Sequence, residues 1–326
     1  MVCQRLLQSD DWQKLTDNSK GIVFTASLLH DIGKLSTARM VDNQLTSRGH
    51  SQRRPALTRL ILWQRNVPFV VPEHIVNLIR HHQVPFWIFE RNNTDALAMK
   101  ISQTTSCYLL CLLSKADAKG RIAPDVDDTV NNVKLFSKLA RSLDCHHAPA
   151  SFASFFGRLL IFNDRWQLPA HAPYGDFKCE MIIISGLPGS EKDHWIKQQT
   201  PHLPVVSLDA LRRTEGIGPT DNQGQIIQMA KAEAKSHLAR YQPLVWNATN
   251  LTFDNRRSHG ELALRNNTKP TIVYVEVPCG RLGHQNAHRQ HAAPENVLKK
   301  IIENRWDVPA PFEAADVTHV VQSPEI

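Results

Sequence analysis

A histidine and an aspartate stand side by side, as His30 and Asp31, within the largely apolar run GIVFTASLLHDIGKL. An imidazole nitrogen is a good ligand for transition metals, and a neighbouring carboxylate can bridge a second ion or orient a water molecule. Taken alone, such a residue is more often a surface group, a hydrogen-bonded core group or a helix cap than a metal ligand. Their order along one region of the chain predicts a metal site with the ligands His30, Asp31, His50, His81, His82 and Asp117.

A second group of residues lies in a glycine-containing turn, where the run MIIIS is followed by GLPGSEKDHW. The first segment has the pattern of a strand, and the second leads into a helix. In such a turn the backbone N–H groups and the helix N-terminus hold phosphates, while a lysine reaches the β- and γ-phosphates of a nucleotide. The turn therefore predicts an ATP site made of Gly186, Leu187, Pro188, Gly189, Ser190, Glu191, Lys192 and Asp193.

Two positions of this turn depart from the P-loop pattern G-x-x-x-x-G-K-[ST]. Glu191 stands where the pattern has its second glycine, so a Cβ atom and a negative charge lie beside the expected anion. Asp193 replaces Ser or Thr and has no hydroxyl for Mg²⁺, although a carboxylate can bind this ion directly or through water. Two interpretations stay open: an ATP site that works with Mg²⁺, and a decayed loop that binds no nucleotide.

The two groups lie in parts of the chain with different patterning. Residues 1–150 carry apolar side chains at the spacing of about 3.6 residues that is typical of helices. After a proline-containing connector at 151–178, β-rich runs alternate with helical segments, which favours a parallel α/β sheet. The sequence therefore predicts two domains, an all-α bundle over 1–150 and an α/β domain with a parallel sheet over 179–326.

The composition of the 326-residue chain favours a polyanionic partner, no membrane contact and a cytoplasmic location. A net charge of +7 at pH 7 and a pI of about 9.1 suit phosphate contacts with RNA or DNA. No apolar run reaches the roughly 18 residues that a membrane helix needs, and the N-terminus has no apolar stretch typical of a signal peptide. The six cysteines are scattered without a CxxC pair, which fits packing positions in a reducing compartment.

Three segments in the first half of the chain resemble the HD phosphohydrolase superfamily. These segments are L-L-H-D-I-G-K at 28–34, R-H-H-Q at 80–83 and K-A-D at 115–117. The resemblance covers most of residues 20–125. It implies that the all-α bundle is an HD domain and that this domain works with a transition metal such as Mn²⁺, Ni²⁺, Co²⁺ or Zn²⁺.

The resemblance assigns metal ligation to three of these residues, His30, Asp31 and Asp117. It implies a second metal ion or a phosphate at the further histidines, which are His50 and either His81 or His82. The superfamily pattern begins with another metal-binding histidine upstream of the pair, and no histidine precedes His30 in this chain. Two explanations follow: the chain starts within the first helix of the bundle, or the protein has lost one ligand and with it part of its hydrolase activity.

The second half of the chain is similar to the 5′-hydroxyl polynucleotide kinase family. In V-V-S-L-D-A-L-R-R, the resemblance implies that Asp209 is the general base for the attacking hydroxyl and that Arg212 contacts the acceptor phosphate. In W-N-A-T-N-L, it places Thr249 and Asn250 beside the acceptor, although Ala248 departs from the family's segment. The alternative for this last pair is a local turn that ends the strand.

A third segment, Q-N-A-H-R-Q-H-A-A-P-E-N-V-L, resembles the helical lid of the same family. The resemblance implies that Arg289 offsets charge on the transferring γ-phosphoryl group. The lid position four residues earlier, commonly another arginine, is Gln285 here. Arg256 and Arg257 are further candidates for contact with a nucleic-acid backbone, and ordinary surface residues are the alternative for both.

Together the two halves resemble bacterial end-healing proteins of the HD–polynucleotide kinase type, over nearly the whole chain. The junction C-H-H-A-P-A-S-F-A-S-F-F takes part in this resemblance. It implies a metal-dependent phosphatase for 2′-, 3′- and 2′,3′-cyclic phosphates and an ATP- and Mg²⁺-dependent kinase for 5′-hydroxyl ends, whose products a ligase can seal. Two alternatives stay open: an HD nucleotide phosphohydrolase with an inactive kinase domain, and a non-enzymatic nucleic-acid-binding remnant.

Overall fold

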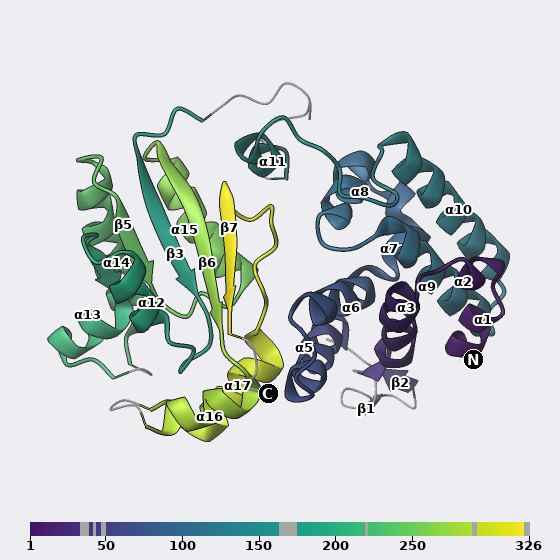
Figure 1. Cartoon of the computed structure of the whole chain (residues 1–326), viewed down its shortest axis with the longest axis horizontal. Helices are drawn as coiled ribbons and strands as arrows, with labels where there is room; N and C mark the ends of the chain where they lie inside the picture. Colours follow the sequence, from purple (N-terminus) through teal and green to yellow (C-terminus); the bar gives the residue numbers. More distant parts are fainter. Residues whose placement is uncertain are drawn as a thin grey trace. The chain divides into compact units, whose positions relative to one another are not determined.

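The computed structural model of the chain divides into two compact units (Figure 1). The first unit comprises Met1–Ser151 and Ile302–Asn304, and the second comprises Phe152–Ile301 and Arg305–Ile326. The structure describes residues 1–32, 39–41, 44–46, 50–162, 175–218, 221–288 and 292–322, and for 39–41, 44–46 and 50–54 it describes the backbone alone. The division after residue 151 lies beside the one expected from the change in patterning.

The first unit consists mainly of helices, in agreement with the predicted all-α bundle. Thr16 and Ser106 cap two of them, because each hydroxyl oxygen accepts a hydrogen bond from a backbone N–H of the first turn. Assignment of this bundle to the HD superfamily stays a prediction. The elements are α1 (Val2–Leu7), α2 (Asp10–Gln13), α3 (Asp17–Leu29), β1 (Arg39–Val41), β2 (Gln44–Thr46), α5 (His50–Gln64), α6 (Val70–His81), α7 (Val84–Trp87), η1 (Ile88–Glu90), α8 (Thr94–Ser102), α9 (Cys107–Gly120) and α10 (Val126–Ser142).

Helix α9 is the centre of this unit and contacts α1, α3, α6, α7, α8 and α10. A helix that is covered on all sides is apolar all round, and the sequence C-Y-L-L-C-L-L of its first turns meets this requirement. Cys107 and Cys111 are buried there as free thiols, in keeping with a packing role. Asp117 is buried in the same helix and is therefore a carboxylate that needs polar partners.

No single helix in the described part of the chain is long and apolar enough to cross a membrane. Helices α8 and α9 satisfy the requirements of length and composition only as a pair, and they are bent by 106° at the break between them. Most of α9 is buried among the other helices of its unit.

The second unit contains a five-stranded parallel sheet with the strand order β4-β5-β3-β6-β7. Strand β3 is central, paired with β5 on one side and with β6 on the other. The predicted parallel α/β sheet is thereby confirmed. The elements are α11 (Phe155–Phe162), β3 (Cys179–Ser185), α12 (Lys192–Gln199), β4 (Val205–Ser207), α13 (Leu208–Glu215), α14 (Gln223–Leu238), β5 (Leu244–Asn247), α15 (Phe253–Leu264), β6 (Thr268–Glu276), α16 (Cys279–Ala287), α17 (Glu295–Arg305) and β7 (Asp316–Val321).

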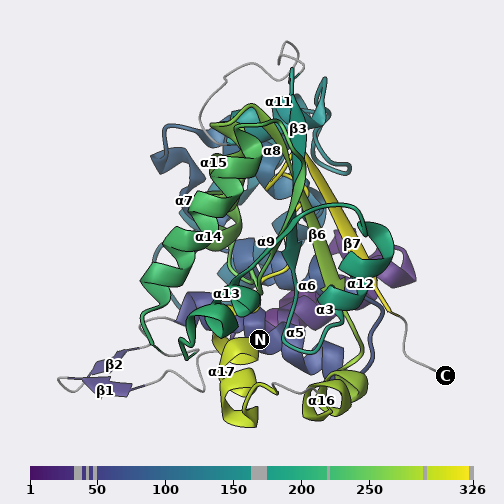
Figure 2. The same cartoon turned by 90° about the vertical axis from the view of Figure 1, so that its left-hand side faces the viewer.

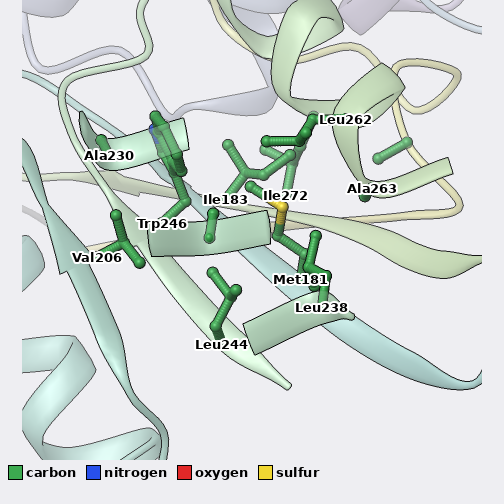
Figure 3. Close-up of a cluster of buried hydrophobic side chains, with 12 residues drawn as sticks. Met181, Ile183, Val206, Ala230, Leu238, Leu244, Trp246, Leu262, Ala263 and Ile272 are labelled. Atoms are coloured by element: carbon green, nitrogen blue, oxygen red, sulfur yellow. The ribbon is translucent and has the colours of Figure 1, made fainter. Parts of the chain in front are cut away.

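Apolar side chains cover both faces of this sheet. Successive residues of a strand point to opposite faces, so Ile183 and Trp246 belong to one core cluster, while Ile182 and Val245 belong to another. The first cluster packs against α14 and α15 (Figure 3), and the second packs against α12. Figure 2 shows these helices on opposite sides of the strands. The sheet is therefore buried on both faces, as parallel sheets generally are.

Helix α11 lies within the expected connector and packs on the second unit. Its Arg158 side chain donates to the backbone oxygen of Pro311 at 2.5 Å. The rings of Phe162 and Phe312 meet edge to face, with 5.5 Å between their centroids. The first part of the connector therefore belongs to the second unit.

Candidate active sites

The glycine-containing turn joins the end of β3 to the start of α12, at the carboxyl end of the central strand. Ligands of open α/β sheets bind at this end of the strands. Gly186 has a φ of +155°, and a Cβ atom there would lie 2.4 Å from the backbone oxygen of Val275 and 2.6 Å from Ser190 Oγ, so only glycine fits. The Gly186 N–H donates to the backbone oxygen of Thr249 at 3.0 Å, which ties the turn to the loop after β5.

Glu191 occupies the glycine position of the pattern with a backbone that glycine favours, at φ +66° and ψ +26°. Such a left-handed conformation costs a non-glycine residue about 1 kcal/mol or more. Each oxygen of the Glu191 carboxylate accepts a hydrogen bond, one from Gln285 Nε2 on α16 and the other, at 2.8 Å, from Gln322 Nε2 after β7. Two of the departures from the expected patterns, Glu191 and Gln285, are thus partners that join the turn to α16.

The side chain of Lys192 spans the turn that precedes it. Its Nζ donates to the backbone oxygens of Gly186 at 2.9 Å and of Leu187 at 2.7 Å. Asp193 accepts a hydrogen bond from Asn247 Nδ2 at 2.7 Å. A cavity of about 300 Å³ opens at the turn, and its lining residues are Gly189, Glu191, Lys192, Asp193, His284, Gln285 and His288. A phosphate group in this cavity would lie beside the Lys192 ammonium.

Asp209 and Arg212, the predicted general base and acceptor contact, lie on α13 and bind each other. Arg212 Nη1 donates to Asp209 Oδ1 at 2.5 Å, and Arg212 Nε donates to Gln223 Oε1 at 2.8 Å. The Asp209 side chain is 68% exposed, so a ligand can reach its carboxylate from solvent. The ion pair must open before the two residues can take up separate roles.

Thr249 and Asn250 follow β5 in very different surroundings. Thr249 is exposed, and its backbone oxygen accepts the hydrogen bond from the glycine turn. Asn250 is buried at φ +44°, and its amide donates to the backbone oxygen of Ile184 at 2.7 Å. The Asn250 side chain therefore binds the backbone of β3, which agrees with the alternative of a local turn at the end of the strand. Of the two residues predicted to contact the acceptor, only Thr249 has an exposed side chain.

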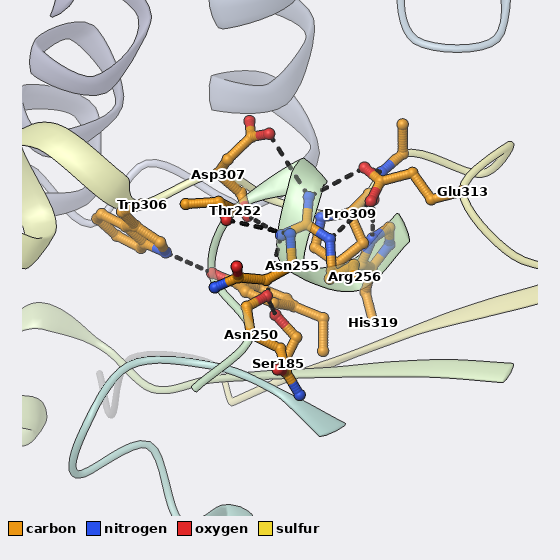
Figure 4. Close-up of polar contacts among 12 residues, drawn as sticks. Ser185, Asn250, Thr252, Asn255, Arg256, Trp306, Asp307, Pro309, Glu313 and His319 are labelled. Atoms are coloured by element: carbon orange, nitrogen blue, oxygen red, sulfur yellow. Dashed lines mark hydrogen bonds and ion pairs between the residues drawn. The ribbon is translucent and has the colours of Figure 1, made fainter. Parts of the chain in front are cut away.

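Arg256 faces the protein interior, so the expectation that it contacts nucleic acid is wrong. Its guanidinium group is fully buried and binds the two carboxylate oxygens of Glu313 at 2.6 and 3.0 Å (Figure 4). It also donates to the backbone oxygens of Asn250 at 3.1 Å and Asp307 at 2.9 Å. Burial raises the pKa of Glu313, and the charge of Arg256 opposes this effect. Arg257 is 51% exposed and stays a candidate for such a contact.

Two predicted site residues lie outside the described side chains. Arg289, the expected lid arginine, comes directly after the described range that ends at residue 288. His50 is the first residue of α5, where the structure describes only the backbone. The roles of both residues stay predictions.

Four of the predicted metal ligands come together in the helical unit. His30 follows α3, His82 follows α6, and Asp117 lies in α9. His30 Nε2 lies 3.3 Å from Asp31 Oδ2 and 3.7 Å from Asp117 Oδ1. His82 Nε2 lies 3.8 Å from Asp117 Oδ2, and the two imidazole rings meet edge to face at 5.5 Å. Residues from three distant segments therefore form one cluster around the buried Asp117 carboxylate.

Backbone carbonyl groups fix the orientation of both imidazoles in this cluster. Nδ1 of His30 lies 2.7 Å from the Ser27 oxygen, and Nδ1 of His82 lies 2.6 Å from the Ile79 oxygen. Because a carbonyl oxygen only accepts hydrogen bonds, each Nδ1 carries a proton and each Nε2 is turned toward Asp117. Burial lowers the pKa of His30, but the neighbouring carboxylates and the Ser27 carbonyl raise it above its usual value.

Arg121 is a further member of this cluster that the motif comparison does not point to. It follows Asp117 by four residues, a spacing that places two side chains together on a helix, and it donates to both Asp117 oxygens. Among the described residues, no three His, Cys, Asp or Glu side chains are arranged to hold a metal ion as they stand. The donor types suit a transition metal, but in this structure Arg121 neutralises Asp117.

His81, the neighbour of His82, is kept neutral by its surroundings. Burial and, to a smaller extent, the positive charges of Arg80 and Lys100 together lower the pKa of His81 to about 3. Of the two adjacent histidines that the sequence left as alternatives, the one whose ring faces Asp117 is His82.

Two histidines that line the cavity beside Lys192 were not singled out from the sequence. His284 and His288 lie on and directly after α16, where a spacing of four residues places side chains on one face of a helix. Their rings stack at 4.1 Å with an angle of 28° between the planes. The spacing H-x-x-x-H is the signal by which they could have been found.

Comparison with known proteins bears on the second unit. Residues 181–306 match the model of a protein family described as an AAA domain. Among solved structures, a candidate kinase from Chloroflexus aurantiacus J-10-fl is similar over 45% of this chain and 87% of that chain, with 20% sequence identity and a TM-score of 0.38. No curated protein matches the chain. The family match, the parallel sheet and the glycine turn with Lys192 define this region as a P-loop kinase-like domain.

Proposed function

We propose that the chain transfers the γ-phosphoryl group of ATP to the 5′-hydroxyl end of a polynucleotide. The observation that carries this proposal is the turn of residues 186–191, which leads to Lys192 beside a cavity of about 300 Å³. The family match over residues 181–306 supports a kinase-type reaction. A polynucleotide acceptor is supported by the resemblance carried by Asp209 and Arg212, and by the net charge of +7.

In this proposal the phosphates of ATP lie in the turn, where they accept hydrogen bonds from backbone N–H groups. Lys192 releases the carbonyl oxygens of Gly186 and Leu187 and binds the β- and γ-phosphates in their place. Asp193 lines the cavity and has the oxygen donors that Mg²⁺ prefers, so it is the residue that would hold this ion, directly or through water. When bound, Mg²⁺ supplies positive charge next to the transferring group.

Asp209 accepts the proton of the 5′-hydroxyl group while the hydroxyl oxygen attacks the γ-phosphorus. The bond between the γ-phosphorus and the oxygen that bridges it to the β-phosphorus breaks, and ADP leaves. Arg212, released from Asp209, contacts the phosphate next to the acceptor sugar. The ion pair between these two residues is therefore a resting arrangement that the acceptor opens.

Transfer of labelled γ-phosphate from ATP to 5′-hydroxyl RNA and DNA oligonucleotides tests the proposal. We expect Asp209→Asn to reduce transfer by roughly a hundredfold, because the amide keeps the size of the side chain but does not accept the proton. Glu215→Gln, which neutralises an exposed carboxylate at the end of the same helix, is the matched control. Unchanged transfer in Asp209→Asn would remove the assigned base, and no transfer by the unmodified protein would remove the function.

For the helical unit we propose a second activity, metal-dependent removal of 2′-, 3′- or 2′,3′-cyclic phosphates. It is supported by the convergence of His30, His82 and Asp117 from three segments, with both Nε2 atoms turned toward one carboxylate. These residues and Asp31 would hold Mn²⁺, Ni²⁺, Co²⁺ or Zn²⁺, which supplies an activated water molecule when bound. Because Arg121 binds Asp117 in this structure, metal binding must compete with that ion pair.

Phosphate release from a 3′-phosphorylated oligonucleotide, with Mn²⁺, Ni²⁺ or Co²⁺ added, tests this second activity. Asp31→Asn should abolish release and lower the metal content of the purified protein, whereas Asp95→Asn, a change at a carboxylate of α8, should alter neither. Competition between oligonucleotides and mononucleotides separates end processing from free-nucleotide phosphohydrolysis. Release that survives Asp31→Asn would contradict the proposed site.

We propose RNA or DNA ends as the partners of the whole chain. The two activities together leave a 3′-hydroxyl and a 5′-phosphate, the pair of ends that a nucleic-acid ligase joins. The basic charge of the chain supports such partners, and binding should then weaken steeply as salt is added. The non-enzymatic alternative requires nucleic-acid binding without any binding of ATP.

A further inference from the structure

The cavity beside Lys192 is also lined by two imidazole rings. His284 and His288 both line this cavity, and their rings are stacked at a distance of 4.1 Å. His288 Nδ1 lies 2.8 Å from the backbone oxygen of His284, so this nitrogen carries a proton and Nε2 is the ring atom left for a ligand. Both side chains are exposed, so a ligand can reach them.

Helix α16 is fixed against the phosphate-binding turn by a side-chain contact. Gln285 lies between the two histidines in the sequence, and its Nε2 donates to the Glu191 carboxylate. Glu191 is held from a second direction by Gln322 at 2.8 Å. Because Glu191 directly precedes Lys192, this contact sets the α16 side chains at the end of the turn where the phosphates of a nucleotide lie.

The charge of the cavity lining is unfavourable for an anion when both imidazoles are neutral. The other charged groups that line it are Lys192, Glu191 and Asp193, which leave one net negative charge. A polyphosphate in this place needs added positive charge to compensate. An imidazole can supply this charge by taking up a proton, because histidine changes charge between pH 5 and 8.

We propose that His284 and His288 bind the terminal phosphates of the nucleotide in their protonated form. They supply the positive charge that the uncharged side chain of Gln285, which lies between them in the sequence, does not supply. This inference rests on the proposed function, since it assigns phosphate-binding residues to the same site. Its consequence is that binding of a polyphosphate takes up protons, so affinity rises as the pH falls from 8.5 to 6.5.

Titration calorimetry of inorganic tripolyphosphate and of ATP at pH 6.5 and pH 8.5 tests this inference. We compare the unmodified protein with a His284→Gln/His288→Gln double variant, and His237→Gln on α14 is the matched control. At pH 6.5 we expect the double variant to bind about tenfold more weakly than the unmodified protein, because charged hydrogen bonds are lost. At pH 8.5 the two proteins should bind almost equally, and fewer protons should be taken up on binding to the double variant than on binding to the unmodified protein.

The ligand also changes its protonation between the two pH values. This contribution is the same for every protein and therefore cancels when the proteins are compared. His284→Gln/His288→Arg should restore affinity and make it insensitive to pH, since a guanidinium group stays charged. Parallel pH profiles for the unmodified protein and the double variant would overturn the inference while leaving the kinase proposal intact. Proton-linked tripolyphosphate binding without phosphate transfer from ATP would instead remove the kinase proposal and keep the phosphate site.

Discussion

In the helical unit the candidate ligands are side chains from three separate segments, whereas in the sheet unit much of the proposed phosphate site is the backbone of one turn. His30, His82 and Asp117 meet only because α3, α6 and α9 pack together. The turn of residues 186–191 depends on local geometry, above all on Gly186, where a Cβ atom would collide with Val275. A site of the first kind depends on the whole bundle, and a site of the second kind depends mainly on its own strand and helix.

In both candidate sites the central charged side chain is already bound to another group of the protein. Asp117 is bound by Arg121, and the Lys192 ammonium is bound by the carbonyl oxygens of Gly186 and Leu187. A ligand must therefore displace a protein group in each case. The two units also differ in accessibility, because Asp117 is buried while Asp209, the expected base of the sheet unit, is exposed.

The strongest way to separate the two sites is a crossed pair of substitutions. Lys192→Met should reduce phosphate transfer from ATP by roughly a thousandfold, because it removes charge compensation at the transferring group. It should leave metal-dependent phosphate release unchanged, and Asp117→Asn should show the opposite pattern. Both activities are measured on the same preparations of full-length protein, and loss of both activities in either variant would show that the sites are not independent.

The buried Arg256 network should matter for the stability of the sheet unit alone. Arg256→Met leaves the Glu313 carboxylate buried without its main partner, and breaking a buried pair in this way costs about 3 kcal/mol. Denaturant unfolding and scanning calorimetry should each show that the transition of the sheet unit occurs under milder conditions, while the transition of the helical unit is unchanged. Arg257→Met, at an exposed arginine one position further along α15, is the control and should change stability by less than about 0.5 kcal/mol.

Arg121 offers a test of competition in the helical unit. We expect Arg121→Gln to increase the affinity for Mn²⁺ or Co²⁺ about tenfold, because the Asp117 carboxylate no longer has a cation bound to it. Equilibrium dialysis with metal analysis measures this directly. Lys119→Gln on the same helix is the control, and an affinity that falls in Arg121→Gln would mean that the guanidinium group supports the site.

A further expected effect is a similar loss of stability in acid from two buried histidines, one in each unit. Burial lowers the pKa of His146 in the helical unit and of His259 in the sheet unit, in each case to about 4. In the unfolded chain these imidazoles titrate near 6.5, so the unfolded state binds more protons between about pH 6.5 and 4 and stability falls as the pH falls. Each should cost up to about 2 kcal/mol between pH 7 and 5.

Calorimetry of His146→Gln and His259→Gln at the two pH values checks this expectation. Each variant should lose less stability on acidification than the unmodified protein, and only in the transition of its own unit. A pH response identical to that of the unmodified protein would mean that the imidazole takes up its proton at the same pH in the folded and the unfolded chain, which would contradict the lowered pKa in the folded protein.

Local patterns were enough to predict the parallel sheet and the glycine turn. The turn carries its signal in neighbouring residues, from Gly186 to Lys192, and so does the alternation of strands and helices. The strand order β4-β5-β3-β6-β7 is a tertiary property that no local pattern contains. Residues 181–306 of the sheet unit match a family model described as an AAA domain, and the HD assignment of the helical unit stays a prediction.

The errors and omissions concern residues whose partners are distant in the sequence. Arg256 appeared suitable for nucleic acid because its partner Glu313 follows only after three further elements, β6, α16 and α17. Glu191 appeared as a defect of the turn because the contact with Gln285 spans most of the second unit. A pattern of neighbouring residues describes the charge of a side chain correctly, but it does not show whether folding brings a partner to that charge.

Equilibrium binding of ATP with Mg²⁺ to the unmodified protein and to Lys192→Met tests the central claim most directly. The account predicts saturable binding to the unmodified protein and at least about tenfold weaker binding to Lys192→Met, because one charged contact to the phosphates is lost. Equal affinity in the two proteins, or no binding of ATP to the unmodified protein, would contradict the claim that the turn ending at Lys192 is a working phosphate site.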